Sequence, residues 1–468
     1  MVDTVSRMEQ VFKAYDVRGT VPDQLDADMC RAIGRAMARF AAAPEILVCR
    51  DMRESGVELA GAFSDGVRAE GVDITDLGMA STDFLYFASG HLDAPGAMFT
   101  ASHNPAQYNG LKMCLSGARP IGRDTGLSEI EAMAEKLLDD PVPAPSVTGG
   151  RTGGLRQLDL LDAWADHVVS FVDRDALRPL TVVADTANGM GGLVVPIVFD
   201  KLPFSIEVLF PELDGSFPNH PADPIQPENL VDLKRAVLER GADIGLAFDG
   251  DADRVFLVDE KAQPVSGSLT TALVAASMLE KHPGETILYN LICSHVVPEV
   301  VTEMGGTPVR TRVGHSIIKQ VMAETGAIFG GEHSGHYYYR DNFRADSGII
   351  TALVVLELLS KSDLPLSEML RPYERYADSG EINTEVADPA ATVAAIAEAE
   401  RAAGAAVDLL DGVTVERDDW WYNVRPSNTE PLLRLNVEAR TPELCAAHVA
   451  EVQRLIVAHA APEKSREN

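Results

Sequence analysis

The sequence predicts an α/β protein in which three similar α/β units are followed by a smaller α+β domain. Its length of 468 residues implies several domains rather than one core. Strand-like runs rich in Val, Ile and Leu alternate with amphipathic stretches of helix length, which is typical of helices packed on a largely parallel sheet. Similar strand openings recur at intervals of about a hundred residues or more, which indicates related units without a clear sequence repeat.

These openings lie at residues 45–50 (EILVCR), 180–185 (LTVVAD) and 286–290 (TILYN). Each is predicted to be a buried strand that ends in a polar turn before a helical segment. Pro and Gly cluster at residues 140–154, which predict a linker, and at residues 211–227, which predict a turn-rich connection.

The C-terminal part, beyond about residue 373, has a different pattern. Residues 386–406 are rich in Ala and Glu and predict a helix, and residues 420–435 predict a strand, a loop and a second strand. The Trp420–Trp421 pair is expected to pack in a core or a hinge rather than to form a ligand platform. This segment is therefore predicted to be the small α+β domain.

Composition and charge exclude several classes of protein. With 46% hydrophobic and 24% charged residues the chain is an ordinary globular protein rather than a disordered one. Forty Lys and Arg against 71 Asp and Glu give a net charge of −31, which disfavours nucleic acid and anionic membranes as partners. Any anionic ligand must therefore meet a local cluster of cations.

Neither targeting nor metal–thiol chemistry is indicated. The N-terminal segment has no apolar stretch after a basic start, and no run of 18 apolar residues occurs, so we expect a cytoplasmic protein without a membrane span. The five cysteines are scattered without C-x-x-C spacing and are predicted to be inert thiols. The histidines and cysteines do not supply a zinc site.

The first loop whose side chains are suited to catalysis is residues 100–105 (TASHNP), which contains Ser102. An isolated serine in such a turn is more often a turn former than a nucleophile. The neighbouring His103 does not indicate a Ser–His hydrolase, because adjacent side chains on an extended chain point apart. No G-x-S-x-G elbow surrounds this serine either.

The second loop places Asp249, Asp251 and Asp253 at alternating positions between two apolar runs. Three carboxylates in a tight loop repel one another unless a divalent cation gathers them, and a solvated acidic turn is the alternative. An EF-hand is disfavoured because Arg254 stands where that motif requires Gly, and because the flanks are strand-like. Three oxygen ligands with open positions suit Mg²⁺ that also holds a phosphate oxygen.

The third region contains two polar turns, residues 312–319 and 331–336. Glu332 and Ser334 flank one residue of a Gly-bounded loop and are suited to the vicinal hydroxyls of a sugar ring. A lone histidine is more often structural, but three lie within 22 positions, which favours an acid/base or phosphate-binding role as strongly as a structural one. These histidines are His315, His333 and His336.

The fourth loop is residues 425–431 (RPSNTEP). Its arginine, hydroxyls and amide form a cradle for an oxyanion, and a capped turn is the alternative for this loop taken alone.

Together the four loops resemble those of the α-D-phosphohexomutase superfamily, the phosphomannomutases and phosphoglucomutases, from Tyr15 to Thr429. The resemblance implies a heart-shaped protein of four domains, three of them similar α/β domains and the fourth a smaller α+β domain. With the pattern above, it places domain I at residues 1–155 with the phosphoserine loop and domain II at 156–260 with the metal loop. Domain III follows at 261–372 with the sugar loop, and domain IV at 373–468 with the phosphate loop.

The resemblance also implies a role for individual residues. Ser102 is the implied phosphoserine, and it shares the metal with Asp249, Asp251 and Asp253, while Lys112 and His315 are the implied acid/base residues. The remaining implied site residues bind the substrate: Tyr15, Arg18, Arg254, Glu332, His333, Ser334, Gly335, His336, Arg425, Ser427, Asn428 and Thr429. One departure is the segment 289–293 (YNLIC), where some relatives carry a lysine that contacts substrate. That contact is therefore expected either to be absent or to be supplied by another residue, for which Lys319 is the candidate.

The activity implied is reversible conversion of hexose 1-phosphate into hexose 6-phosphate, with mannose preferred and glucose second. Mg²⁺ and a hexose 1,6-bisphosphate are the implied cofactor and intermediate, and a small phosphosugar is the only implied partner. The sequence leaves monomer and dimer open. Phosphoglucosamine mutase is the alternative within the family. A metal-dependent sugar phosphatase or a phosphosugar sensor are alternatives from other classes, and a sensor has no need of Ser102.

Overall fold

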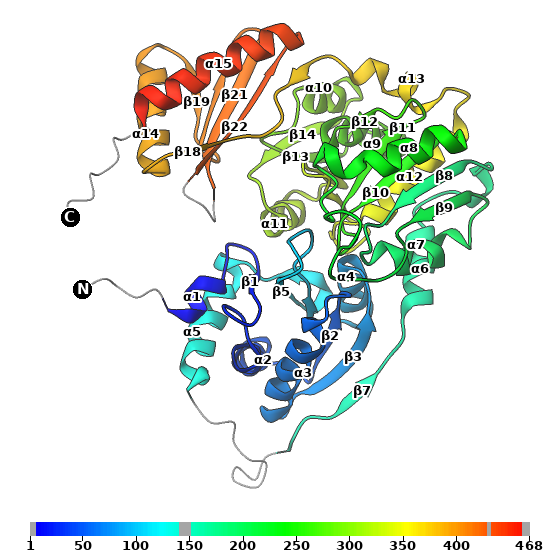
Figure 1. Ribbon diagram of the computed structural model, residues 1–468, viewed down its shortest axis with the longest axis vertical. Coiled ribbons are helices and arrows are strands. Elements are labelled where there is room, and N and C mark those ends of the chain that lie inside the picture. The colour runs from blue at the N-terminus through cyan, green and yellow to red at the C-terminus, as the bar shows by residue number, and fades with distance from the viewer. Residues whose placement is uncertain (1–5, 140–150, 428–431, 461–468) are drawn as a thin grey trace.

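The computed structural model describes residues 6–139, 151–427 and 432–460. These residues form four units, each built on one β-sheet and called domains I to IV in chain order. Figure 1 shows domain I at the bottom, domain II at the right, domain III at the upper centre and domain IV at the upper left. Helices cover the first three sheets, and two long helices, α14 and α15, pack on the fourth. The predicted fold class is confirmed.

Domain I has the strand order β1-β5-β4-β2-β3-β7. Its strands are β1 Val17–Thr20, β2 Glu45–Arg50, β3 Asp73–Met79, β4 Gly96–Phe99, β5 Tyr108–Leu115, β6 Arg119–Pro120 and β7 Leu155–Gln157. Its helices are α1 Arg7–Val11, α2 Ala27–Ala41, α3 Ser55–Ala69, α4 Thr82–Leu92 and α5 Leu127–Leu138, with the 3₁₀ turns η1 Ser116–Ala118 and η2 Arg123–Thr125. β2 pairs parallel with β3 and β4, but β5 pairs antiparallel with β4 and β1, so the sheet is mixed rather than largely parallel.

Domain II repeats this plan with the order β12-β11-β10-β8-β9. Its elements are α6 Leu161–Val169, β8 Thr181–Asp185, α7 Gly191–Phe199, β9 Ser205–Leu209, α8 Val231–Arg240, β10 Ile244–Phe248, β11 Val255–Asp259 and β12 Pro264–Val265. Antiparallel pairs β4–β5 and β10–β11 enclose residues 100–107 and 249–254 respectively. The serine loop and the aspartate loop therefore each begin at the end of a buried strand, and the chain then returns as the neighbouring antiparallel strand.

Domain III has the strand order β14-β13-β15-β16. Its elements are α9 Gly267–Lys281, β13 Thr286–Asn290, α10 Val296–Glu303, β14 Thr307–Thr311, α11 His315–Thr325, β15 Phe329–Gly331, β16 Tyr337–Tyr339, α12 Gly348–Lys361 and α13 Leu366–Leu370. The sugar-loop residues 332–336 connect the antiparallel pair β15 and β16. A third predicted loop therefore occupies the same kind of turn.

Domain IV is an antiparallel sheet with the path β17-β22-β21-β20-β19. Its elements are β17 Ala377–Asp378, β18 Ile382–Glu385, α14 Pro389–Ala402, β19 Ala406–Asp408, β20 Val413–Glu416, β21 Trp420–Pro426, β22 Leu432–Ala439 and α15 Pro442–His459. The predicted helix and the predicted pair of strands are present as α14 and as β21 with β22.

The strands predicted at residues 45–50 and 286–290 have the predicted bounds, and the strand predicted at 180–185 begins one residue later, at Thr181. The predicted limits of the four domains stay predictions. The sheet of domain II extends to Val265, beyond residue 260, and most of the predicted linker lies outside the described residues.

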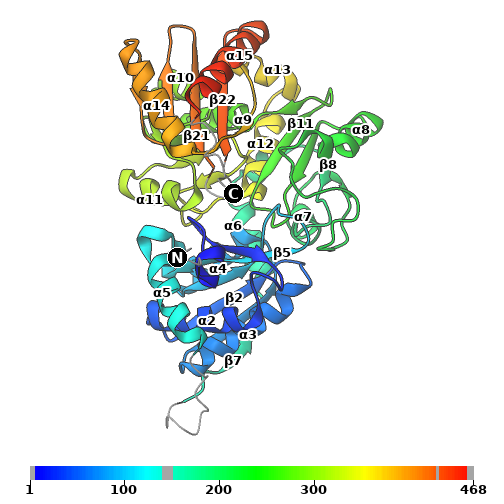
Figure 2. The ribbon, with the colours of Figure 1, turned by 60° about the vertical axis from the view of Figure 1, so that its left-hand side comes forward.

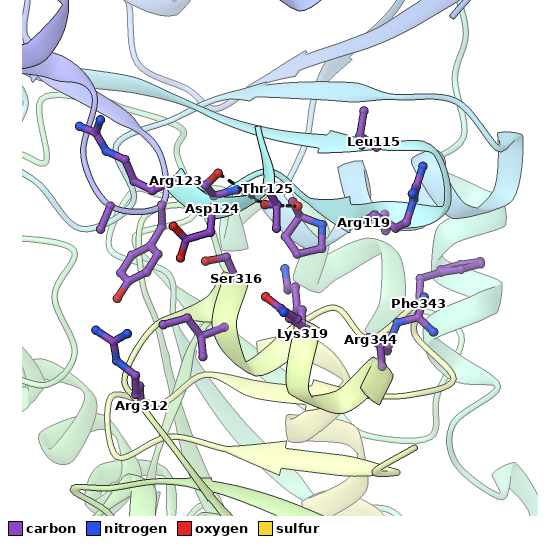
Figure 3. A pocket seen from close by; sticks show the side chains of 18 residues that line it. Leu115, Arg119, Arg123, Asp124, Thr125, Arg312, Ser316, Lys319, Phe343 and Arg344 are labelled. Carbon is purple, nitrogen blue, oxygen red and sulfur yellow. Dashed lines mark hydrogen bonds between the residues drawn. The ribbon is translucent and has the colours of Figure 1, made fainter. Parts of the chain in front are cut away.

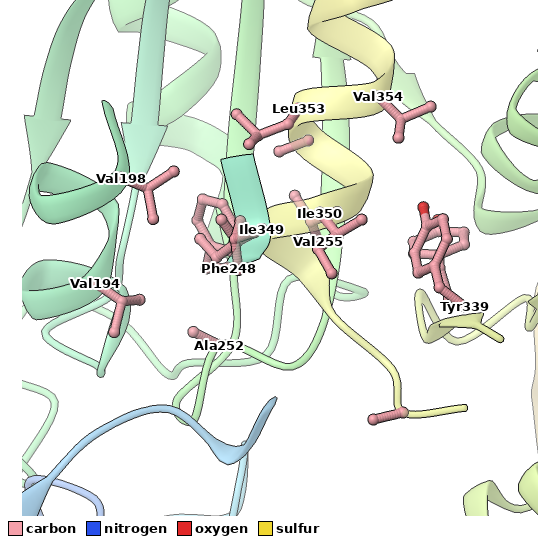
Figure 4. Close-up of a cluster of buried hydrophobic side chains, with 14 of the residues drawn as sticks. Val194, Val198, Phe248, Ala252, Val255, Tyr339, Ile349, Ile350, Leu353 and Val354 are labelled. Atoms are coloured by element: carbon pink, nitrogen blue, oxygen red, sulfur yellow. The ribbon is translucent and has the colours of Figure 1, made fainter. Parts of the chain in front are cut away.

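One hydrophobic core joins the first three domains. It contains residues from Leu47 to Leu370, including Trp164, whose ring meets that of Phe84 of domain I edge-on at 6.3 Å. Figure 4 shows α12 of domain III packed against domain II through Ile349, Ile350 and Leu353, which face Phe248 of β10 and side chains of α7. Domain IV has a separate core centred on β20–β22.

All five cysteines are buried and free, and burial raises the pKa of each of them. In the part of the chain that the structure describes, the helices are too short or too polar to cross a membrane.

Domain IV meets domain III through a polar and aromatic contact around His295 of domain III. The His295 ring stacks on Trp421 with centroids 5.5 Å apart, and its Nε2 lies 3.1 Å from Oε2 of Glu416. Its backbone N–H donates to Glu438 at 3.0 Å. Burial lowers the pKa of His295, but the hydrogen bond and charge of Glu416, with Glu438 and Glu299, outweigh it and raise the pKa above its ordinary value. Trp421 is thus buried in the contact between the two domains, in line with the predicted packing role, and its role in a hinge stays a prediction.

The raised pKa predicts how this contact depends on pH. Because protonated His295 is favoured in the folded protein, its contribution to stability is complete below the unfolded pKa of about 6.5 and is lost as pH rises through the raised pKa. We therefore expect His295→Gln to lower the melting temperature at about pH 6 and to have a smaller effect at about pH 9. Differential scanning calorimetry of both proteins checks this. An equal difference at both pH values would contradict the ion pair.

Candidate active site

The loop between β4 and β5 presents Ser102 in a strained turn. Its φ of 47° lies in the left-handed region, which is uncommon for a residue other than glycine and is concentrated at functional sites. The backbone N–H of Ser102 donates to Oγ1 of Thr100 at 2.9 Å. Its Oγ donates to Oδ2 of Asp249 at 2.7 Å, although the side chain is only 5% exposed. The turn therefore directs the hydroxyl at the acidic loop of domain II.

The same turn corrects the expectation that Ser102 and His103 point apart. Ser102 Oγ lies 3.3 Å from Nδ1 of His103, because the chain here is a left-handed turn and not an extended strand. Although the His103 side chain is exposed to solvent, desolvation by the surrounding loop, followed by the charges of Arg254 and Arg18, lowers its pKa below the usual range. His103 is thus a neutral neighbour of the serine hydroxyl.

The three aspartates between β10 and β11 form one buried cluster. Oxygen atoms of Asp249, Asp251 and Asp253 all lie within 4.8 Å of one another, and the residues are at most 1% exposed. A side chain at the intervening Gly250 would clash with the carbonyl oxygen of Ser102, so glycine is what lets the two loops approach. The predicted convergence of the serine and the aspartates is present in the structure.

Two cations neutralise this cluster. Nε of Arg254 donates to Oδ2 of Asp249 at 2.9 Å, and Nζ of Lys112 lies 2.9 Å from Asp251 and 2.6 Å from Asp253. Burial raises the pKa of Asp249 to about 7 against the influence of Arg254. Burial also acts to raise the pKa of Asp251, but Lys112 and a hydrogen bond from Thr82 outweigh it and hold that pKa below its ordinary value.

The cluster fits a divalent cation. Oδ1 of Asp251 and Oδ1 of Asp253 are buried without a hydrogen-bond partner, which leaves two hard oxygen ligands free beside Ser102. Asp253, His336 and Asp346 also form a group of suitable spacing. That group is already occupied by positive charge, because Nζ of Lys319 lies 2.8 Å from Asp346.

The sugar loop holds Glu332 rigidly. Its Oε1 accepts from the hydroxyl of Tyr338 at 2.6 Å, and its Oε2 accepts from Nδ2 of Asn290 at 3.1 Å. Asn290 lies in the segment where relatives carry a lysine, and here it orients the carboxylate of Glu332. Gly335 has a φ of 84°, and a Cβ there would strike the ring of Phe256.

The two histidines of the sugar loop have different partners: His336 contacts the acidic groups of the active site, and His333 contacts a serine of α9. Nδ1 of His336 lies 2.9 Å from Oδ2 of Asp346, and burial is outweighed by Asp253 and Asp346, so the pKa of His336 is raised. Nδ1 of His333 lies 3.0 Å from Oγ of Ser268, and burial lowers its pKa. Ser334 is half-buried between them.

Backbone contacts place the sugar loop beside the metal loop. Arg254 and His336 form an antiparallel bridge, and the N–H of Val255 donates to the carbonyl oxygen of Gly335 at 3.3 Å. The aspartates of domain II and the hydroxyl-binding residues of domain III are thus fixed relative to each other.

Three residues from domains I and III border this cluster. Nη1 of Arg18 donates to the carbonyl oxygen of Ala101 and to Asn104, so it supports the serine loop. The hydroxyl of Tyr15 donates to the carbonyl oxygen of Val313 at 2.9 Å, and its ring packs on His315 with centroids 5.7 Å apart. Burial and the nearby lysines hold the pKa of His315 well below its usual range.

The predicted substrate role of Lys319 does not fit its position. The residue is 2% exposed, and its ammonium pairs with Asp346 and lies 3.4 Å from the ring centroid of Tyr86. Its charge is used to balance Asp346 inside the protein. Of the cations expected to gather for an anionic ligand, Arg18, Lys112 and Arg254 thus lie at the cluster, Lys319 is paired inside the protein, and Arg425 lies in domain IV.

The phosphate loop of domain IV is described only in part. Arg425 is 5% exposed, pairs with Glu381 and donates to Oδ1 of Asn436 at 2.8 Å. The N–H of Ser427 donates to the carbonyl oxygen of Leu432 at 2.9 Å. Asn428 and Thr429 lie outside the described residues.

Sequence reasoning missed Arg53, which holds the serine loop in place. Its guanidinium donates to four carbonyl oxygens of residues 102–108 at 2.6 to 3.0 Å and pairs with the buried Asp51 at 3.2 Å. The side chain is 1% exposed. The available signal was an Asp-x-Arg directly after the buried strand β2, because this end of the strand lies at the sheet edge that carries Ser102.

Replacing Arg53 by alanine is expected to lower kcat by about 10²-fold with little change in KM, because a small displacement of a reacting group has that cost. Arg53→Lys should retain part of the activity, since it keeps the charge but fewer donors. Steady-state kinetics of both variants and of Arg68→Ala, which removes a half-buried arginine of α3, test this. An effect on KM alone would contradict a positioning role.

Comparisons with known proteins agree along the whole chain. It matches four domain families of phosphoglucomutase/phosphomannomutase: α/β/α domain I over residues 9–139, domain II over 162–263, domain III over 266–376 and the C-terminal domain over 381–455. It is 40% identical over 453 residues to a phosphomannomutase of Salmonella montevideo, which covers 95% of this chain and 98% of that protein.

Two further similarities extend this result. The chain is 39% identical over 432 residues to the phosphohexose mutases of Xanthomonas campestris pv. campestris, with 92% of this chain and 95% of that protein covered. Its fold matches the crystal structure of a phosphoglucomutase/phosphomannomutase family protein from Burkholderia thailandensis with a TM-score of 0.87 and 33% identity, over 99% of both chains.

Proposed function

The chain belongs to the phosphoglucomutase/phosphomannomutase family and transfers phosphate within hexose phosphates, and we propose that Ser102 carries this phosphate between O1 and O6. Mannose 1-phosphate is the proposed preferred substrate and glucose 1-phosphate the second. The relatives named phosphomannomutase support the first of these.

One observation carries the assignment of Ser102. Its buried hydroxyl is held by a strained turn at 2.7 Å from Asp249 and at 3.5 Å from Nη2 of Arg254. A turn former has no need of a carboxylate and a guanidinium from another domain. Phosphoryl transfer needs this combination, because it depends on positioning and on positive charge around the phosphoryl oxygens.

The metal proposed for the site is Mg²⁺, held by Asp249, Asp251, Asp253 and a phosphoserine oxygen. When bound, it neutralises charge on the transferring phosphoryl group. Arg254 and Lys112 add positive charge at the same place, which answers the problem of binding a phosphosugar to a chain of net charge −31.

The proposed cycle begins with phosphorylated Ser102. A sugar hydroxyl attacks the phosphorus and passes its proton to a base, the bond to Oγ breaks, Oγ takes up a proton, and hexose 1,6-bisphosphate forms. The bisphosphate then turns end over end within the site, and Oγ loses its proton and attacks the other phosphorus. The sugar oxygen that leaves takes up a proton, which restores the phosphoserine and releases the second hexose phosphate. Catalytic amounts of the bisphosphate are therefore expected to activate the protein.

The pKa directions divide the acid/base work between two residues. Burial lowers the pKa of Lys112, but Asp251 and Asp253 raise it further than burial lowers it, so the ammonium keeps its proton. His315 has a lowered pKa and is neutral, so it is able to accept one. Because a raised pKa makes the ammonium a weak proton donor, Lys112 is proposed as the acid only toward the strongly basic Oγ that leaves the phosphorus, and otherwise as a fixed positive charge; His315 is the proposed base. Glu332 and Ser334 are the proposed contacts to the ring hydroxyls.

The function is tested by incubating the protein with mannose 1-phosphate, Mg²⁺ and a trace of hexose 1,6-bisphosphate while mannose 6-phosphate and free phosphate are both measured. Glucose and glucosamine 1-phosphates serve as competing substrates. We expect isomerisation that depends on the bisphosphate. Free phosphate without isomerisation would establish a phosphatase, preference for glucosamine 1-phosphate would establish the other mutase, and binding without turnover would establish a sensor.

Arg425 is proposed to hold the phosphate that is not reacting. Loss of a charged hydrogen-bond donor costs about 1.5–3 kcal/mol, so Arg425→Ala should lower kcat/KM by about 10- to 100-fold. The rate at which phosphorylated Ser102 is hydrolysed in the absence of a hexose phosphate should not change. Arg434→Ala is the matched control, because Arg434 pairs with the same Glu381 but is 36% exposed. Equal activity of Arg425→Ala and wild type would contradict the clamp.

A further inference from the structure

A cavity of about 480 Å³ lies between domains I and III, beside the catalytic cluster. Domain I contributes Tyr15 and residues 115–125, and domain III contributes Arg312, one side of α11 and residues 343–344. Figure 3 shows Leu115, Arg119 and Arg123–Thr125 above this space and Arg312, Ser316 and Lys319 below it.

The cavity is distinct from the phosphate-transfer site. Its described lining shares Tyr15 with the predicted substrate-binding residues, but it contains neither Ser102 nor the three aspartates, and it contains neither Glu332 nor Arg425. Strand β5 carries Lys112 at the catalytic cluster and Leu115 in the cavity wall. Three residues of strand separate them by about 10 Å, at about 3.3 Å per residue.

The charge of the cavity is opposite to that of the protein. Its lining has five cationic side chains and the single acid Asp124. Two of the cations are already neutralised, Lys319 by Asp346 and Arg123 by Glu131. The other three are Arg119, Arg312 and Arg344, and no carboxylate of the described residues pairs with them. Among the described residues, three guanidinium groups of this cavity thus lack a carboxylate partner in a chain of net charge −31, although Nε of Arg119 donates to the carbonyl oxygen of Ser116 at 3.2 Å.

The walls between these charges are largely apolar. Leu115, Ala118, Pro120, Ile317 and Phe343 contribute hydrocarbon surface. The volume lies within the range of about 300–1,000 Å³ that holds small organic ligands, so an inorganic anion alone would leave most of it empty. Guanidinium groups both pair with phosphate oxygens and stack on flat rings.

From this combination we propose that the cavity binds a nucleoside phosphate, an anion attached to a flat ring system. This goes beyond the proposed mutase function, which needs no such ligand. The ligand would bridge domains I and III where Tyr15 of one domain contacts Val313 and His315 of the other. Its binding therefore stabilises the domain contact that sets the position of His315.

The test is isothermal titration of the full-length protein with GDP and with ADP, with pyrophosphate as the charge without the ring and guanosine as the ring without the charge. The double variant Arg119→Gln/Arg344→Gln removes two unpaired cations from the cavity. Arg235→Gln is the matched control, an exposed arginine of α8 in domain II. Ala323→Trp, at an exposed position of α11 in the cavity wall, blocks the space and keeps every charge.

We expect a nucleoside diphosphate to bind at least about tenfold more tightly than pyrophosphate or guanosine, and the double variant to lose about tenfold or more in affinity. Ala323→Trp should weaken the nucleotide more than pyrophosphate, Arg235→Gln should change nothing, and saturating glucose 1,6-bisphosphate should leave the binding intact. Absence of nucleotide binding, equal affinity of the double variant and wild type, or displacement by the bisphosphate would each overturn the proposal. Thermal melts of the variants establish that they are folded.

Discussion

Replacing Ser102 by alanine lowers kcat for hexose 1-phosphate by about 10³-fold or more, because the phosphoryl group then has no acceptor on the protein. The fold should survive, since the change removes one hydrogen bond to Asp249, which is worth about 1 kcal/mol. The measurement is steady-state isomerisation together with transfer of labelled phosphate from hexose 1,6-bisphosphate to the protein. We expect neither activity nor label in the variant.

The control for this experiment is Ser64→Ala, which removes a half-buried hydroxyl of α3 that donates to the carbonyl oxygen of Ala60 in its own helix. It should keep both activity and label. Label in the Ser102 variant would place the phosphate carrier on another side chain, with His103 as the first to examine because it lies 3.3 Å from the serine hydroxyl.

Replacing Lys112 by methionine has the largest expected effect on stability. Its ammonium is the only partner among the described residues that balances the charges of both Asp251 and Asp253. Removing one member of a buried ion pair costs about 3–5 kcal/mol, so the metal-free variant should melt at a clearly lower temperature and lack activity. A divalent cation replaces the lost charge, and Mg²⁺ should therefore restore much more stability to the variant than it adds to wild type.

Thermal melts with EDTA and with millimolar Mg²⁺ measure both effects. Lys261→Met serves as control, because Lys261 is 59% exposed at the protein surface and should show the wild-type response. A Lys112 variant as stable as wild type in EDTA would show that the aspartates carry no uncompensated charge without the metal, and that Asp251 and Asp253 are protonated there.

Much of the site was visible in the sequence because its loops follow buried strands. Residues 45–50 and 286–290 have the bounds that their apolar pattern predicts, and the three aspartates lie in the turn between two such strands. Local patterns of this kind survive folding because a strand buried on both faces must end where polar residues begin.

What the sequence did not show depends on contacts between distant residues. The antiparallel return of β5 makes the first sheet mixed, and the left-handed turn at Ser102 brings His103 to its hydroxyl. Lys319 was expected at the substrate, but Asp346, a residue 27 positions further along the chain, takes its charge. Neither a turn conformation nor a buried pairing partner follows from residue type alone.

The continuous core of domains I to III has a consequence for synthesis on the ribosome. Its members run from Leu47 to Leu370, and α12 supplies many of them, so the core cannot close until most of the chain has emerged. At about 5–20 residues per second this delay is roughly 20–70 s. During that interval the residues of this core that have already emerged lack their packing partners, whereas the separate cores of domain I and of domain IV each close within one domain.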